Sequence, residues 1–358
     1  MIHRERLLET FLHLVRIPSP SGQEEEVARA IVRYLNDLGA DVETDEAGNL
    51  LAHFDGQGDP LLLTAHMDTV TPCDRINPVV RDGVIYSDGT SILGADDKSG
   101  VAIILEVLQV PADEDMPRRP LDILFTVEEE VGLAGARAFD MSRLRARMGI
   151  GLDSGGGRGI IIVSAPSQDS LVATVHGRSA HAGAHPEQGI NAIRVAAEAI
   201  AAMPLGRIDE ETTANIGVIN GGDATNIVPD RVTMRGEARS RNTAKLEAQT
   251  GAMVNALESA AQAHGATVNV QVTRAYEAYN LDEDNPIVRL VADAMRSLDI
   301  EPCMVPSGGG SDGNIFNAAG IPMVQISAGM QEVHTCQEYV ALDDMVAAAE
   351  LVLACVKP

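Results

Sequence analysis

The stretch Ile123–Gly132, ILFTVEEEVG, passes abruptly from apolar residues to three consecutive glutamates and a glycine. Its first half predicts a buried parallel strand, and the glutamates predict the loop at the carboxyl end of that strand. Carboxylates in such a place are costly unless a positive charge meets them. Taken alone, Glu128, Glu129 and Glu130 are better explained as solvated charges that open the next helix, where the helix dipole favours anions.

Length and charge limit the classes of protein that this chain can represent. Its 358 residues suggest about two domains, and the formal net charge of -25 gives a surface that repels phosphate backbones. We therefore expect no nucleic-acid partner. The start MIHRERLLETF is typical of an amphipathic helix, and no apolar stretch is long enough to span a bilayer. The four scattered cysteines contain no CxxC pair, so we expect reduced thiols in a soluble, cytoplasmic protein without membrane association.

Two further apolar strands end in residues that can bind metals. Leu61–Ala65 is followed by His66, and Ile150–Leu152 is followed by Asp153. In open α/β sheets, ligand sites lie outside the carboxyl ends of the strands. The three strand ends, including the one at the glutamates, therefore predict one shared site.

Each candidate residue also has an ordinary explanation. His66, with Asp68 two residues later, could be a partly buried polar residue at a strand end, and Asp96 and Asp97 could cap the apolar helix that follows them. Asp153 precedes glycines and could lie in an ordinary turn. His334 could be a surface histidine. Together, however, two imidazoles and several carboxylates form a donor set suited to Zn²⁺, with Mn²⁺ or Co²⁺ as alternatives.

The pattern of strands and helices changes near Gln168. From there the order is βαββαβ, which predicts a ferredoxin-like unit with an antiparallel sheet and helices on one face. The α/β pattern resumes from Asn285. We therefore predict an α/β catalytic domain with a mostly parallel sheet, residues 1–167 and 278–358, and an inserted α+β domain at 168–277.

Three local patterns add to this outline. Residues 3–16 and 23–38 show helical periodicity, and Ser21 with Glu24 predicts a capping box for the second helix. The stretch GGGSDG at 308–313 lacks the spacing and the lysine of a P-loop. It is better interpreted as a glycine-rich rim where substrate approaches the backbone.

Seven segments in order, TAHMDTV, LGADDKSGVA, FTVEEEVGLAGA, GLDSGG, SAHAG, TNIVP and EVHTCQEY, resemble the motifs of the dinuclear zinc exopeptidase and aminoacylase family. The DDK and EEEVG forms are most similar to its peptidase T-like branch. The resemblance covers nearly the whole chain and implies that family's catalytic domain with its inserted lid and dimerisation domain. One departure is Cys336, where many relatives have proline, and it puts the pocket rim in doubt.

The resemblance implies two zinc ions per subunit. His66 and Asp153 would hold one ion, and Glu130 and His334 would hold the second. Asp96 would bridge both ions.

The same resemblance assigns roles to the neighbours of these ligands. Glu129 would be the general base for the water that the two ions share, and Asp68 would orient His66. The Asp96–Asp97 peptide bond would be cis. Glu128 receives no role.

In the inserted domain, the resemblance implies that His181 stabilises the tetrahedral oxyanion. Asn226 and Arg239 match positions that contact the substrate's backbone or carboxylate, and Gly310 would lie at the substrate rim. Their ordinary alternatives are a strand-end histidine, a turn asparagine and a surface arginine. We also expect a homodimer formed through the inserted domain.

These observations predict a dizinc hydrolase that cleaves an amide bond of a short peptide, with a tripeptide aminopeptidase as the first choice. An N-acyl-amino-acid deacylase or a carboxypeptidase-like amidohydrolase could use the same centre. From another class, a catalytically silent, metal-stabilised dimer that binds peptides is the alternative.

Overall fold

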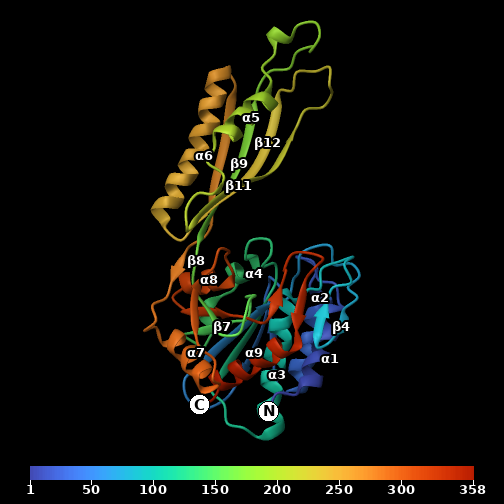
Figure 1. The fold of residues 1–358 in the computed structure, drawn as a ribbon, viewed down its shortest axis with the longest axis vertical. Helices are drawn as coiled ribbons and strands as arrows, with labels where there is room; N and C mark the ends of the chain where they lie inside the picture. The colour runs from blue at the N-terminus through green and yellow to red at the C-terminus, as the bar shows by residue number, and fades with distance from the viewer. The chain divides into compact units, whose positions relative to one another are not determined.

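The computed structural model describes residues 1–358, which divide into two compact units (Figure 1). Unit 1 comprises Met1–Ser164, Asn280–Ser307 and Ser311–Pro358, and unit 2 comprises Ala165–Tyr279 and Gly308–Gly310. The mostly parallel α/β sheet and the separate antiparallel sheet that the sequence predicts are both present.

A nine-stranded sheet forms the centre of unit 1. Its strands, in spatial order, are β1 (Val42–Thr44), β2 (Leu50–Phe54), β6 (Leu121–Thr126), β3 (Leu61–His66), β7 (Gly149–Gly151), β16 (Met323–Ile326), β8 (Ile160–Ala165) and β14 (Tyr279–Asn280), with β15 (Cys303–Pro306) beside β8. The neighbours β6, β3, β7 and β16 are parallel to one another, so their carboxyl ends meet at one edge of the sheet.

Helices of unit 1 pack against this sheet and against one another. They are α1 (Arg4–Val15), α2 (Glu25–Asp37), α3 (Ala95–Glu114), α4 (Ala134–Ala138), α7 (Pro286–Ser297), α8 (Asp312–Ala318) and α9 (Leu342–Cys355). No helix in the structure has both the length and the apolar character that crossing a bilayer requires.

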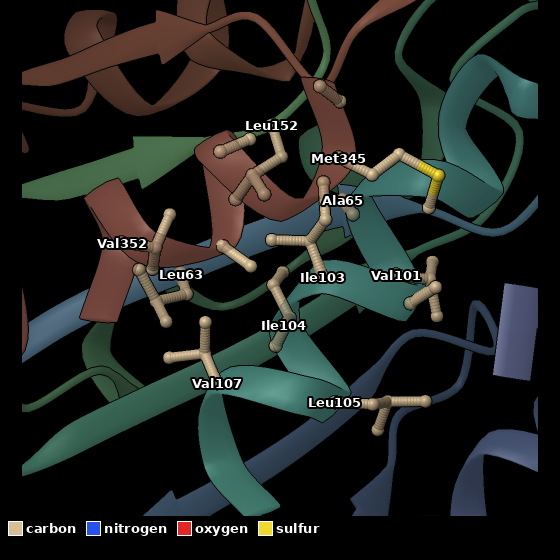
Figure 2. Packing of buried hydrophobic residues seen from close by; sticks show 14 of the residues in the cluster. Leu63, Ala65, Val101, Ile103, Ile104, Leu105, Val107, Leu152, Met345 and Val352 are labelled. Carbon is tan, nitrogen blue, oxygen red and sulfur yellow. The ribbon is translucent and has the colours of Figure 1, made fainter. Parts of the chain in front are cut away.

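Helix α3 lies in the middle of the core of unit 1. Every residue from Ala95 to Leu108 is buried, because this helix is covered on all sides. Figure 2 shows Ile104 and Val107 of α3 beside Leu63 of β3 and Val352 of α9. The packing holds the first turn of α3 at the carboxyl edge of the sheet.

Unit 2 has the βαββαβ order that the sequence predicts. Its elements are β9 (Ser167–His176), α5 (Ala192–Ala202), the short β10 (Gly206–Arg207), β11 (Thr212–Gly221), β12 (Arg231–Ser240), α6 (Thr243–His264) and β13 (Thr267–Tyr276). The strand order is β10-β11-β12-β9-β13 and all pairs are antiparallel. Leu171, Val175, Met234, Leu246 and Leu257 are among its buried core residues.

A third, small sheet was not predicted. It joins β17 (Met330–Gln331), β18 (Tyr339–Ala341), β5 (Val84–Tyr86) and β4 (Val79–Arg81). Strands of two or three residues are too short to show a period in sequence.

The predicted capping box at the start of α2 is wrong. Glu24 occupies the N-cap position, and no side chain caps the helix. The Ser21 hydroxyl donates instead to Asp68 Oδ2 (2.7 Å), and the Glu24 carboxylate accepts the N–H groups of Gly22 (2.9 Å) and Glu128 (3.1 Å). Both side chains therefore support the loop that carries the glutamates.

Candidate metal centre

The predicted ligands of unit 1 lie at the carboxyl edge of the central sheet. His66 is the last residue of β3, Glu130 follows β6, and Asp153 follows β7. Asp96 lies in the first turn of α3, and His334 lies in the loop between β17 and β18. Parallel pairing of β6, β3 and β7 explains how residues distant in sequence reach one place.

Asp96 presents one oxygen to each histidine. Its Oδ1 lies 3.1 Å from Nε2 of His66, and its Oδ2 lies 3.2 Å from Nε2 of His334. Glu130 Oε1 lies 3.1 Å from the same His334 nitrogen. The ligand atoms of His66, Asp96 and Asp153 lie within 4.8 Å of one another, as do those of Asp96, Glu130 and His334. The five residues thus form two trios that share Asp96.

The carboxylates of this cluster cannot all be charged without a compensating cation. Burial raises the pKa of Asp153 well above its usual value, and the charges of Glu129 and Asp96 add to this shift. Burial likewise raises the pKa of Glu129, with further increases from Asp312 and Glu130. Buried acids in such a group require nearby positive charge that neutralises them.

The two histidines supply that positive charge as long as no cation does. Burial lowers the pKa of His66, but hydrogen bonds to Asp68 and Asp96 outweigh burial and leave this pKa well above its usual value. Hydrogen bonds to Asp96 and Glu130 raise the pKa of His334 to about 10. Two imidazoles and these carboxylates are also the donor types that Zn²⁺ prefers, so the residues fit a pair of divalent cations.

Asp68 organises the backbone around the cluster. Its carboxylate accepts the N–H groups of Glu129 (2.9 Å) and Glu130 (3.2 Å) as well as the Ser21 hydroxyl. Nδ1 of His66 lies closer to the main-chain oxygen of Asp68 (2.9 Å) than to its carboxylate (3.3 Å). A donating Nδ1–H leaves Nε2 facing Asp96, which is the tautomer that a metal ligand requires.

Uncommon backbone conformations gather at the same place. The Asp96–Asp97 peptide bond is cis, as the resemblance implies. Glu128 and His334 have φ values of 51° and 63°, in the left-handed region that side chains other than glycine rarely adopt. Such positions are enriched at functional sites.

Two buried acids near the cluster were missed by the sequence analysis. Asp312 of GGGSDG accepts the hydroxyl of Thr126 at Oδ2 (2.5 Å), whereas its Oδ1 has no hydrogen-bond partner. Burial raises the pKa of Asp312 to about 6. Glu338, four residues after His334, is also buried. The acid inside the glycine-rich segment is the sequence signal for Asp312, whereas Glu338 lies in the polar stretch HTCQEY and has no comparable signal.

His181 and Asn226 belong to unit 2, where their segments pair with each other. The N–H of Ala182 donates to the Asn226 carbonyl (2.9 Å). The exposed His181 ring accepts the N–H groups of Gly183 and Ala184 at Nδ1, both at 3.1 Å. In the neutral ring the proton is therefore on Nε2, which is available as a donor.

Arg239 and Gly310 also belong to unit 2. The Arg239 guanidinium donates to both carboxylate oxygens of Glu237, at 2.9 Å and 3.1 Å. A Cβ atom at Gly310 would lie 2.3 Å from the Tyr276 ring, so this position has room only for glycine. The close neighbour of Gly310 in the structure is thus a tyrosine ring. Cys336 is half-buried and, like the other three cysteines, unpaired.

Comparison with known proteins identifies a family and several relatives that this chain resembles. The model for peptidase family M20/M25/M40 matches residues 62–357. The uncharacterized protein YqjE of Bacillus subtilis is 42% identical, over 100% of this chain and 99% of its own. The solved aminopeptidase PepT of Bacillus cereus is 40% identical with a TM-score of 0.88, covering 99% of this chain and 98% of its own.

A solved tripeptidase from Staphylococcus aureus is 39% identical with a TM-score of 0.94, covering 100% of this chain and 98% of its own. The matched region includes every predicted ligand of the candidate centre. This chain is a member of peptidase family M20/M25/M40.

Proposed function

We propose that this chain is a dizinc metallopeptidase that releases the N-terminal residue from short peptides, with tripeptides as the preferred substrates. The observation that carries the proposal is the position of Asp96 between His66 and His334. A carboxylate shared by two ligand trios is the arrangement that a two-metal hydrolase needs. The similarity to a solved aminopeptidase and a solved tripeptidase at about 40% identity supports the choice of substrate.

In this proposal the two ions would be held by five residues: His66, Asp153, Asp96, Glu130 and His334. When bound, these ions would lower the pKa of the attacking water and polarise the scissile carbonyl. Mn²⁺ or Co²⁺ could replace Zn²⁺ with the same donors.

Glu129 is the proposed general base. Its N–H is fixed by Asp68, and burial raises the pKa of its carboxyl, which suits a group that accepts and then returns a proton. The water oxygen bonds to the carbonyl carbon while Glu129 takes a proton. The C–N bond then breaks as that proton passes to the leaving nitrogen, giving a free amino acid and a shortened peptide.

Unit 2 supplies the proposed substrate contacts. His181, with the proton on Nε2, would donate a hydrogen bond to the oxyanion. Asn226 and Arg239 would bind the peptide backbone and its terminal carboxylate, and Gly310 would lie at the substrate rim. We further propose a homodimer formed through unit 2 and a cytoplasmic location, in keeping with four unpaired cysteines. A monomer in sedimentation analysis would remove the dimer from the proposal.

Hydrolysis of matched substrates tests this function. Zinc-loaded protein is given trialanine, N-acetyl-trialanine and N-acetylalanine, and the products are identified by mass spectrometry. The expected result is release of alanine from trialanine and no hydrolysis of either acetylated compound. Hydrolysis restricted to the acetylated compounds would indicate a deacylase, and no amide hydrolysis would leave a peptide-binding protein.

Glu129→Gln tests the mechanism. We expect kcat to fall by about 10²–10⁴-fold while the bound zinc is unchanged, because the side chain takes a proton and is not needed to hold the ions. Glu128→Gln is the matched control, since Glu128 is adjacent and half-buried. Full turnover in Glu129→Gln would remove Glu129 from the mechanism.

A further inference from the structure

We propose that Glu338 is a positioning residue for Asp96, the carboxylate that the two ligand trios share. The proposal rests on the metal centre of the proposed function and adds a residue that is not itself a ligand. The buried side chain of Glu338 joins two segments of the centre.

The Glu338 carboxylate is occupied by the backbone that leads into α3. The residue is 1% exposed, and its Oε2 accepts the N–H groups of Leu93 (2.7 Å) and Gly94 (2.8 Å). Its other oxygen, Oε1, accepts the N–H of Asp96 (3.0 Å). Because both oxygens face amide groups, this carboxylate holds backbone in place and does not bind an ion.

The start of α3 requires such a partner. The first N–H groups of a helix have no acceptor within the helix, and Gly94 at the N-cap position has no side chain to supply one. Asp96 and Asp97 interrupt the helical geometry further, with ψ values of 105° and 33°. Buried amides without acceptors are costly, and a carboxylate is favoured at the positive end of a helix. No local side chain caps α3, and Glu338, near the other end of the chain, therefore supplies the acceptor for the N–H groups at its start.

Glu338 is also fixed to the segment that carries His334. Its N–H donates to the Thr335 carbonyl (3.2 Å), which closes the turn directly after His334. Its carbonyl accepts the N–H of Ser87 beside β5 (3.0 Å), so its main chain is held by the small sheet. The side chain thus ties the loop of Asp96 to the loop of His334. The 3.2 Å distance between Asp96 Oδ2 and His334 Nε2 depends on this connection through Glu338.

The test compares two buried glutamates of unit 1. In Glu338→Gln, the amide NH₂ group replaces one accepting oxygen and cannot accept an N–H, so at least one of the three bonds is lost. Glu106→Gln is the matched control, because Glu106 lies on α3, is 3% exposed, and accepts the His3 N–H (2.7 Å) and the Arg6 guanidinium (2.6 Å).

The readouts are the affinity of the metal-free protein for Co²⁺ and the visible spectrum of the Co²⁺-loaded protein. Both variants should lose thermal stability. Only Glu338→Gln should bind Co²⁺ about 10–100-fold more weakly and show a changed spectrum, because only Glu338 positions Asp96. Native affinity and spectrum in Glu338→Gln would overturn the proposal, and so would equal losses in both variants.

Peptide hydrolysis by the native chain separates this proposal from the proposed function. A native chain that binds Co²⁺ but cleaves no peptide would defeat the function and leave the role of Glu338 standing. A native chain that binds no Co²⁺ would defeat both. If Glu338→Gln fails to fold, amide hydrogen exchange of the metal-free native chain takes its place. Slow exchange at Leu93, Gly94 and Asp96 would support the proposal, and fast exchange there would overturn it.

Discussion

Nε2 of His334 lies 3.2 Å from Oδ2 of Asp96, while the other oxygen of this carboxylate lies 3.1 Å from Nε2 of His66. One side chain on the first turn of α3 thereby connects a residue of β3 with a residue of the loop before β18. Changes at Asp96 should therefore affect both halves of the centre together.

Asp96→Asn should lose both ions, because an amide offers one neutral oxygen where the native residue offers two charged ones. The measurement is the zinc content of dialysed protein by elemental analysis. Glu128→Gln should keep the native zinc content, since its side chain belongs to neither trio. Undiminished zinc in Asp96→Asn would show that this carboxylate is not shared.

Metal binding should release protons and tighten as the pH rises. The pKa of His334 is raised to about 10 by its hydrogen bonds to Asp96 and Glu130, so the metal-free protein carries an imidazolium there at pH 7. A cation must displace this proton, so zinc affinity should increase from pH 6 to about pH 9. Titration calorimetry in buffers of different ionisation enthalpy counts the protons. His334→Ala should release about one fewer, and identical heats in all buffers would contradict the prediction.

Asp312→Asn should stabilise the metal-free protein at neutral pH. Burial raises the pKa of Asp312 to about 6, so the folded chain holds a proton that the unfolded chain has lost between about pH 4 and pH 6. Stability from this group is thus present below pH 4 and is lost as the pH rises through 6. The variant should gain on the order of 2 kcal/mol relative to native between pH 4 and pH 7. Urea unfolding at the two pH values measures this, and a gap that does not change with pH would refute it.

Arg239→Met should raise KM for trialanine by about 10–100-fold, the loss expected for a bidentate charged hydrogen bond. The native chain and the variant should differ little on trialanine amide, which has no terminal carboxylate. Arg235→Met is the control, because Arg235 lies on the same strand and is exposed. An equal rise in KM for trialanine and for trialanine amide would show that Arg239 does not recognise the terminal carboxylate.

The central part of the site could be predicted because buried parallel strands are continuous apolar runs in sequence. LLLTA before His66 and ILFTV before the glutamates are such runs, and β3 and β6 are neighbours in the sheet. His334 has no comparable local signal. Only the resemblance to a known family suggested that it joins Asp96.

Contacts between distant segments could not be predicted in the same way. Ser21 and Glu24 match the local pattern of a capping box, but their side chains bond to Asp68 and to the backbone of Glu128 instead. The contact between Glu338 and Asp96 spans 242 residues and leaves no trace in periodicity. Tertiary partners decide where a polar side chain points, and a short sequence pattern does not contain them.

Unit 1 is made of separate stretches of chain, and this has a consequence for its synthesis on the ribosome. His66, Asp96 and Asp153 emerge before unit 2, whereas His334 follows Glu130 by 204 residues and emerges after it. A nascent chain therefore contains the residues of the first trio early, but His334 of the second trio and Glu338, which accepts the Asp96 N–H, emerge only when translation is nearly finished. Polypeptides released prematurely after unit 2 would lack both His334 and Glu338, and therefore could not form the second trio of the candidate centre.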